Sequence, residues 1–330
     1  SYDKSFYNDR LDLNAIAVYE YQKNQRENNR VDASNFPSDL TPYITSAASI
    51  TGGTANFTEY AMASALTRVN LGWEGKYLFS ASIRRDGSSK FPKSGRFGYF
   101  PSVSAGWVVS QENFLKGVET ISLLKVRASY GSTGNQEGIG NFAYRRTIGG
   151  GFNYFDTPGF ALSAIGSPNL KWESTDQIDI GIDLGLFNNR LEISADYYNK
   201  KTKDLLLNRP IPNTTGFTTI LENIGNIKGS GFDFQITSRN FTGSNFNWST
   251  SLNLSTYKNE VTKLYNDQPI DQGFVVRHAV GQPLGSFFLI KSLGVDPETG
   301  DMKYEDIDGS GTVTSADRQF LGNPLPKFYG

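Results

Sequence analysis

The chain contains no cysteine, a single histidine and only two methionines among its 330 residues. The lack of cysteine excludes disulfide bonds, thiol catalysis and cysteine-ligated metal sites. The one histidine, His278, belongs to no repeated catalytic motif, and the sequence has no Gly-x-Ser-x-Gly motif of the kind that carries a nucleophilic serine. We therefore expect a loop-packing role for His278 and no enzymatic activity.

Strong charge of one sign and long apolar runs are also missing. The net charge of -1 argues against a nucleic-acid partner. No stretch of about 18 consecutive apolar residues is present, so the sequence predicts no transmembrane helix. The chain has no signal peptide at Ser1, and its first residues read like the interior of a longer protein, so we expect a fragment.

Alternation of apolar and polar residues, in contrast, is abundant. Residues 176–187 read DQIDIGIDLGLF, which puts Ile178, Ile180 and Ile182 on one face and aspartate or glycine on the other. This period of two predicts a strand, and it resumes after 188–190, so we expect a tight hairpin. Similar patterns predict strands at 11–21, 65–73, 77–83, 99–109, 124–130, 232–236 and 246–257. No helical period extends far, so the predicted fold is all-β.

The connections between these strands alternate in length. Long ones are expected at 22–64, 131–175, 200–229 and 258–325, and short ones at 74–76, 188–190 and 240–245, with another strand beginning near Pro326. In an antiparallel up-and-down meander, this alternation gathers the long loops at one end, as in outer-membrane barrels. We therefore predict part of a transmembrane β-barrel, about ten strands by the alternation, in which 258–325 is a long extracellular loop.

Aromatic residues at the strand ends support a barrel in lipid. Trp73 and Tyr77 flank one tight turn, and Tyr19 and Tyr21 close a strand at the opposite end. Such residues form the aromatic girdles of outer-membrane barrels. Cross-strand aromatic pairs in a soluble sheet are the alternative, but they do not explain the loop asymmetry.

One loop has the spacing of a calcium site. Residues 306–317 read DIDGSGTVTSAD, and an EF-hand-type loop takes oxygen ligands at its first, third, fifth, seventh, ninth and twelfth positions with glycine at the sixth. Those oxygen positions are held by Asp306, Asp308, Ser310, Thr312 through its carbonyl, Thr314 and Asp317. Ser310 replaces a charged ligand and Asp317 is shorter than the usual glutamate, so any calcium affinity should be weak, roughly 0.1 to 1 mM. Turn formation without a metal remains open, because no helices flank the loop.

Other motifs carry weaker signals. Residues 138–143 match Gly-x-Gly-x-x-Ala, but they lack the strand and helix that a dinucleotide-binding turn requires. Glu192 and Asp196 should line the barrel interior instead of forming a glycosidase pair. We interpret Arg84, Arg85 and Asp86 as a network at a strand end. Aromatic residues of the predicted external loops are expected to pack on one another, with contact to sugars or to a lid as the alternative: Phe152, Tyr154, Phe155 and Phe160.

Several stretches resemble the SusC/RagA family of TonB-linked outer-membrane transporters. Residues 83–107, IRRDGSSKFPKSGRFGYFPSVSAGW, resemble the family's RRDGSS.F...RFG.FPS.S.GW segment, and 124–136, LKVRASYGSTGNQ, resemble its LKLRASYG.TGNQ segment. The sequences NLKWE at 169–173 and GNPLPKF at 322–328 are similar to shorter family motifs. The resemblance runs in order along essentially the whole chain.

The resemblance implies a larger barrel closed around a plug domain, of which this chain holds neither the plug nor the C-terminal strands. It further implies uptake of oligosaccharides or peptides at the bacterial outer membrane. The implied partners are a SusD-like surface lipoprotein and the TonB complex, with no required cofactor beyond possible calcium in the loop at 306–317. Two other functions stay open on the residues alone: a soluble calcium-dependent β-sandwich or adhesin module, and a passive porin.

Overall fold

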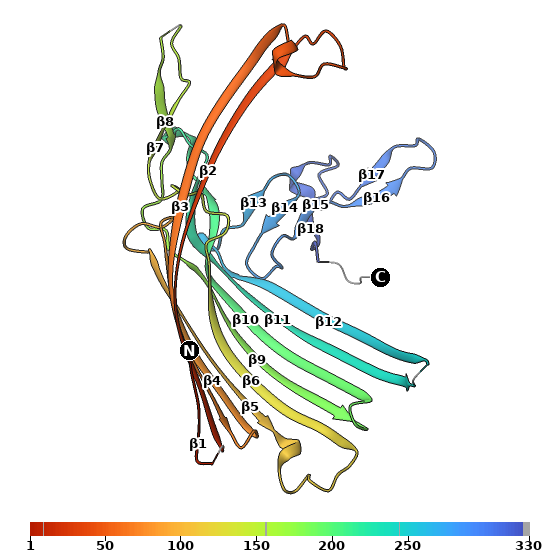
Figure 1. Ribbon diagram of the computed structural model, residues 1–330. Helices are drawn as coiled ribbons and strands as arrows, with labels where there is room; N and C mark the ends of the chain where they lie inside the picture. Colours follow the sequence, from red (N-terminus) through yellow and green to blue (C-terminus); the bar gives the residue numbers. More distant parts are fainter. Residues whose placement is uncertain (9, 156, 244, 326–330) are drawn as a thin grey trace.

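One curved sheet forms most of the molecule (Figure 1). The computed structural model describes residues 1–8, 10–155, 157–243 and 245–325. In that part of the chain no helix is long and apolar enough to cross a membrane. The sheet has ten antiparallel strands, namely β1 Tyr2–Phe6, β2 Leu11–Ser34, β3 Ser49–Trp73, β4 Tyr77–Ser88, β5 Phe97–Val108, β6 Ile121–Asn135, β9 Glu173–Leu186, β10 Leu191–Pro210, β11 Thr219–Thr242 and β12 Asn247–Lys263.

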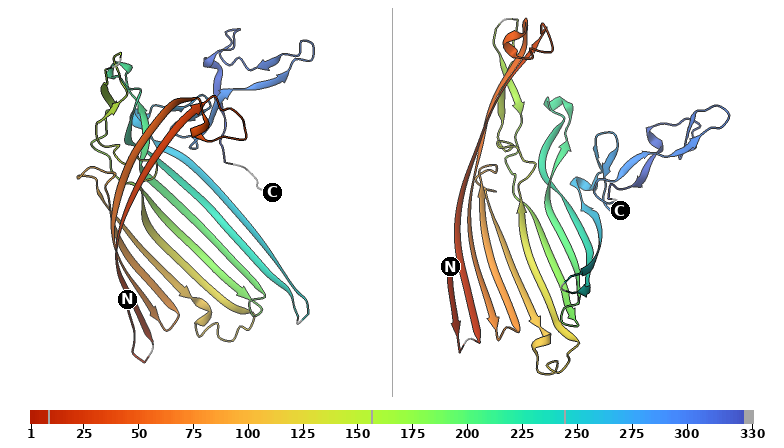
Figure 2. Two further views of the ribbon diagram at one scale, coloured as in Figure 1. Left: turned by 45° about the horizontal axis from the view of Figure 1, so that its top comes forward. Right: turned by 45° about the vertical axis from the view of Figure 1, so that its right-hand side comes forward.

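These strands follow one another in sequence order across the sheet, so the predicted all-β, up-and-down topology is confirmed. Between β6 and β9 a separate hairpin is formed by β7, Thr147–Gly150, and β8, Phe160–Ala164. The sheet is not closed, and β1 and β12 are its two edges (Figure 2). The helical elements are single 3₁₀ turns: η1 Ile44–Ser46, η2 Val109–Gln111, η3 Asn213–Thr215, η4 Tyr265–Asp267 and η5 Ser315–Asp317.

The strands are longer than their sequence patterns predict. β2 and β3 have 24 and 25 residues, whereas about 9 to 11 tilted residues cross a bilayer. The predicted loop at 22–64 was therefore wrong, because only 35–48 connects the two strands, and the loop predicted at 200–229 shrinks to 211–218. The β2 extension, residues 22–30, is polar on both faces, so it lacks the alternation that signals a strand. The β3, β10 and β11 extensions do carry apolar residues, such as Phe57, Leu206 and Ile224, but not with a sustained period of two. Backbone pairing along the whole β2–β3 ribbon forms them nevertheless.

A small β-lobe follows β12, in place of the irregular loop predicted at 258–325. Strands β13 Ile270–Gln272, β14 Val276–His278, β15 Phe287–Ile290 and β18 Arg318–Gly322 form one sheet, and β16 Ser292–Val295 pairs with β17 Met302–Tyr304. The lobe is joined to β12 where the Val261 amide donates to the Gln282 carbonyl at 2.9 Å. Val261, Leu264 and Ile270 form its buried contact with the sheet. The strand predicted near Pro326 lies outside the described residues.

The register of the sheet separates two faces. Trp73 pairs with Tyr77, Tyr77 with Trp107 and Trp107 with Val126, and Val126 pairs in turn with Ile182. This face is apolar and exposed, as a lipid-facing surface should be, and we call it the outer face. Residues of the other parity carry most of the charge, and we call that side the inner face. The end of the sheet with the short connections is the turn end, and the opposite one is the loop end.

Candidate functional site: the inner face, the loop end and the acidic loop

An ion-pair network lies on the inner face. The Arg127 guanidinium of β6 donates to both carboxylate oxygens of Asp183 on β9, at 2.8 and 3.0 Å. It also pairs with Asp196 on β10 at 2.9 Å. Gly181 lies between these partners, and a Cβ at that position would approach the Arg127 guanidinium carbon at 2.9 Å. The missing side chain therefore lets Arg127 reach across two strands.

The sequence analysis placed Glu192 and Asp196 on this face, and the structure agrees: Asp196 joins the Arg127 network and Glu192 pairs with Arg239 at 2.9 Å. It did not find the partnership of Arg127 with Asp183. Both residues occupy polar positions of predicted strands, and the predicted meander makes β6 and β9 neighbours, but the register between the two strands was not predicted. That register puts Arg127 opposite Gly181 and diagonal to Asp183.

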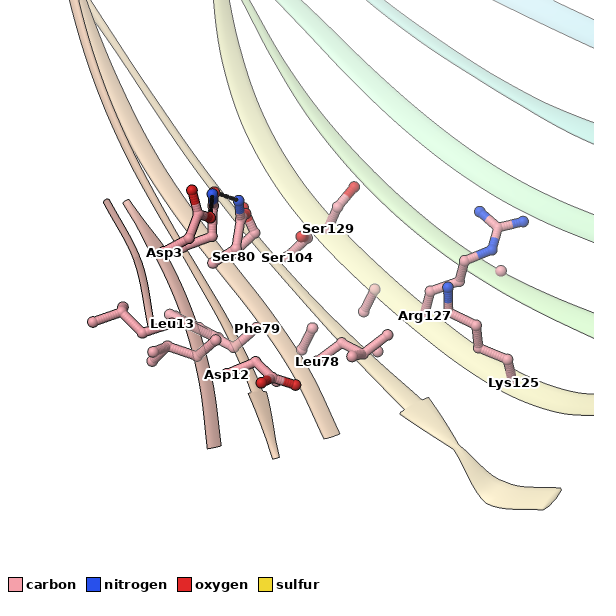
Figure 3. Close-up of a pocket in the computed structure, with 18 of the residues that line it drawn as sticks. Asp3, Asp12, Leu13, Leu78, Phe79, Ser80, Ser104, Lys125, Arg127 and Ser129 are labelled. Carbon is pink, nitrogen blue, oxygen red and sulfur yellow. Dashed lines mark hydrogen bonds between the residues drawn. The ribbon is translucent and has the colours of Figure 1, made fainter. Parts of the chain in front are cut away.

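Beside the network, the inner face has a trough of about 700 Å³, whose surface is more apolar than polar but carries hydroxyl and charged groups (Figure 3). Ser80, Ser104 and Ser129 form one row of its lining on three successive strands. In the next row glycine and larger residues alternate from strand to strand: Gly72, Leu78, Gly106, Arg127 and Gly181. Arg127 and Lys125 lie at one side of the trough. At the other side the Asn70 amide donates to the Asn14 side-chain oxygen at 2.9 Å. The trough can receive polar groups of both charge signs.

At the loop end, the Arg84, Arg85 and Asp86 triplet divides between the two faces. Arg84 donates to Asp86 at 2.7 Å and to Ser64 at 3.1 Å, and all three side chains lie on the inner face. Arg85 points to the outer face, where its guanidinium lies 3.8 Å from the centre of the Phe97 ring. The predicted network is therefore real for two of the three residues, because neighbouring positions of a strand face opposite sides.

A cluster of buried apolar side chains fills the inner face just below the loops. It consists of Phe91, Phe100, Ile139, Leu170 and Trp172. The ring centres of Phe91 and Trp172 are 4.9 Å apart, and those of Phe100 and Trp172 are 5.7 Å apart. The Trp172 indole donates to the Arg96 carbonyl at 3.0 Å. Two of the stretches that resemble family motifs, 83–107 and 169–173, thus meet in space at this cluster.

Two other motifs from the sequence analysis, the Gly-x-Gly-x-x-Ala segment and the loop aromatics, also lie at the loop end. Ile139 of the Gly-x-Gly-x-x-Ala segment is buried in the cluster, and no helix follows it, so the segment is not a dinucleotide-binding turn. The loop aromatics Phe152, Tyr154, Phe155 and Phe160 are more than half exposed. Only Tyr154 and Phe155 pack their rings together, with centres 4.8 Å apart. The expectation that these side chains bury one another was therefore largely wrong.

The acidic loop brings three of its six predicted ligands together. Carboxylate oxygens of Asp306, Asp308 and Asp317 all lie within 4.8 Å of one another. Asp306 accepts amide hydrogen bonds from Gly309, Ser310 and Gly311 at 2.7 to 3.2 Å. These bonds curl the backbone around the carboxylate cluster.

Asp317 is buried under the loop and holds it closed. It accepts from the amides of Thr314 at 2.7 Å and Ile307 at 2.9 Å. These backbone hydrogen bonds, that from Thr314 first, lower the pKa of Asp317 below its ordinary value. The Ser310 hydroxyl donates to the Thr312 carbonyl and the Thr314 hydroxyl accepts from the Ala316 amide, so these three predicted ligands are bonded within the loop.

The family described as TonB dependent receptor-like, beta-barrel matches residues 2–319. The chain belongs to this family. It is 36% identical to TonB-dependent receptor P3 of Formosa agariphila, over 99% of this chain and 35% of that protein. It is 34% identical to TonB-dependent receptor SusC of Bacteroides thetaiotaomicron, over 82% of this chain and 29% of that protein.

Among solved structures, the RagAB peptide transporter matches 97% of this chain and 37% of that one, with a TM-score of 0.86 and 26% sequence identity. The resemblance to the SusC/RagA family is confirmed, and the chain is part of an outer-membrane β-barrel. It spans about a third of the length of the curated relatives it matches. These relatives are named as receptors and not as enzymes.

Proposed function

We propose that the complete protein imports oligosaccharides or peptides across the outer membrane with energy supplied through TonB. A SusD-like surface lipoprotein would close over the nutrient at the loop end. The observation that carries this proposal is the match of 97% of the chain to the RagAB peptide transporter at a TM-score of 0.86. RagAB is named a peptide importer with closed-closed and open-open states, and SusC is the curated relative at 34% identity.

The inner face supports transport of polar molecules. Its trough is lined by serine, asparagine, aspartate, lysine and arginine side chains. Such a surface can exchange hydrogen bonds with sugars, and its separate acidic and basic groups can meet the ends of peptides. The exposed aromatic residues of the β7–β8 hairpin are suited to contact a lid or to stack on sugar rings, since they have no buried partner of their own.

Family membership and the fold argue against the alternative functions. A soluble β-sandwich needs two sheets packed face to face, whereas the ten-stranded sheet leaves its apolar outer face open. A passive porin would have an open lumen, whereas the family resemblance implies a plug.

The test is uptake of labelled oligosaccharides and peptides by cells that produce the complete protein, with and without the TonB system. Uptake should stop when the TonB system is removed, while entry of a small solute through general porins should continue unchanged. Nutrient uptake that persists without TonB would refute the energy-coupled mechanism. Loss of uptake on deletion of a candidate SusD-like lipoprotein alone would identify the partner.

We also propose that the acidic loop binds calcium and that the ion stiffens the lobe near the lid. Three carboxylates within 4.8 Å of one another fit the oxygen ligands that calcium prefers. The ligands would be drawn from the six predicted positions, Asp306, Asp308, Ser310, the Thr312 carbonyl, Thr314 and Asp317, and Asp317 also holds the loop closed from beneath. The ion would neutralise the repulsion between the carboxylates and so hold the loop in its curled form.

A further inference from the structure

The outer face carries a depression that the nutrient pathway does not use. It encloses about 600 Å³ near the turn end and its surface is almost wholly apolar. The side chains around it come from β2, β3, β4, β5, β6 and β9, and they include Leu71, Phe79, Ala105, Ala128 and Ile180. These five follow one another in register across neighbouring strands, as one row over the outer face.

The depression exists because two adjacent members of that row are alanines. Ala105 of β5 pairs directly with Ala128 of β6, so neither strand has a large side chain at this height. Phe79 stands on one side of the pair and Ile180 on the other, each about two-fifths to a half exposed. The strands that carry Phe79 and Ile180 are three strand spacings apart, or about 14 Å. A slot of this width admits the acyl chains of a lipid.

Aromatic side chains close the depression at the turn end. Trp73, Tyr77 and Trp107 lie there, with the Tyr77 and Trp107 rings stacked at 6.5 Å between centres. Glu112, in the connection after β5, fixes both rings, because it accepts hydrogen bonds from the Tyr77 hydroxyl at 2.6 Å and from the Trp107 indole at 3.2 Å. Tryptophan and tyrosine held in this way mark the level of the lipid head groups.

Charged residues of both signs lie immediately beyond the aromatic side chains. Arg10 and Glu74 follow Leu11 and Trp73 towards the turn end, and their side chains approach only to 3.7 Å. Lys76 lies 3.4 Å from Glu74 and 3.7 Å from Glu112. In the described part of the chain Arg10 has no other ion-pair partner. Lys76 is largely buried between the two carboxylates, and Glu112 is held by the two rings. Arg10 and Glu74 are the more exposed charges, and they match a head group that itself carries one positive and one negative charge.

We propose that this depression is a specific binding site for a zwitterionic phospholipid of the inner leaflet, with a phosphate and a primary ammonium in its head group. The acyl chains lie over Ala105 and Ala128. The phosphate meets Arg10, and the ammonium meets Glu74. The inner leaflet is assigned because the short connections of outer-membrane barrels face the periplasm. Such a lipid would anchor the barrel wall at the interface on the side of the energy-coupling machinery.

The test is lipid retention by the complete receptor, purified in mild detergent and titrated with phosphatidylethanolamine or phosphatidylglycerol, with bound lipid counted by native mass spectrometry. The wild type should retain one phosphatidylethanolamine in preference to phosphatidylglycerol. Ala105→Phe and Ala128→Phe should each weaken retention at least about tenfold, because each buried methylene contributes roughly fourfold in affinity. Ala105→Leu should also weaken lipid retention.

Ala81→Phe is the matched control, since Ala81 also lies on the outer face of β4 but does not line the depression. It should retain lipid like the wild type. Glu74→Gln should abolish the preference for phosphatidylethanolamine while leaving acyl-chain binding intact. Equal retention by wild type and Ala105→Phe, or equal loss in Ala81→Phe, would overturn the site. Equal binding of the two lipids by the wild type would overturn the head-group assignment.

Discussion

Replacing Gly134 with alanine should wedge apart the buried cluster at the loop end. Gly134 lies near the end of β6, under the ring of Phe100, and a Cβ added there would lie 2.7 Å from both Cε atoms of that ring. Contacts below 3.0 Å are essentially never seen for real Cβ atoms. The ring has little room to slide, because Trp172 packs against it and the backbone of Gly98, two residues earlier on the same strand, lies so close that a Cβ there would meet the ring at 2.8 Å.

The size of the effect follows from this confinement. Overpacking a close-packed core costs typically about 1 to 3 kcal/mol, and we expect Gly134→Ala to fall in that range. Phe100→Ala alone should cost about 3 to 5 kcal/mol, because it leaves a cavity beside Trp172. In the double variant the methyl group added at position 134 enters that cavity, so the overpacking cost of Gly134→Ala disappears. The loss of unfolding free energy in the double variant should therefore be smaller than the sum of the two single losses by about 1 to 3 kcal/mol.

The assay is denaturant unfolding of the complete receptor in detergent, combined with hydrogen exchange of the β4–β5 connection, which reports the cluster locally. Gly131→Ala is the control, since its added Cβ would meet only the Ser102 Cβ at 3.6 Å, an ordinary contact. Gly131→Ala should be close to neutral. A cycle in which the Gly134 and Phe100 effects simply add would refute the argument that the two positions share one confined space.

Three further outcomes are expected. Calcium should bind the complete protein with a dissociation constant of roughly 0.1 to 1 mM, and titration calorimetry should show no such binding after Asp306→Ala or Asp308→Ala; an unchanged calcium response would refute the metal site. Burial lowers the pKa of His278, so the unfolded lobe takes up a proton below about pH 6.5 before the folded one does. Stability of the lobe should therefore fall as the pH drops below that value, with faster hydrogen exchange over β13 to β15, and His278→Gln should remove this pH dependence. Arg127→Met should leave Asp183 without its arginine partner on a partly exposed face, and we expect it to lower the free energy of unfolding by on the order of 1 kcal/mol. The same unfolding assay measures this change. A larger loss of stability in Asp183→Asn than in Arg127→Met would contradict the assignment of Arg127 as the centre of the network.

The membrane-crossing part of the fold could be predicted from sequence because its physics is local. A strand between lipid and an aqueous interior must alternate apolar and polar residues, and Ile178, Ile180 and Ile182 display that period directly. Short turns such as 74–76 likewise carry their own signal. Strand order followed, since neighbouring segments of a meander are neighbours in space.

Beyond the membrane-crossing strands, the alternation of apolar and polar residues no longer predicted the secondary structure. The β2–β3 ribbon continues through residues 22–30, which are polar on both faces, so the backbone pairing there leaves no trace in the side-chain pattern. The lobe after β12 was predicted as a loop for a different reason. Its strands are only three to five residues long, too short to show a clear alternation.

The spacing of the acidic loop predicted which residues could bind calcium, since all the ligand positions lie within one loop of twelve consecutive residues. The Arg127 network, the cluster around Phe100 and the lipid-sized depression over Ala105 and Ala128 depend on contacts between strands far apart in sequence. In a sheet, register decides which side chains meet. Sequence by itself therefore determined the faces, the turns and the spacing of the acidic loop, and the tertiary structure alone decided which residues of different strands act together.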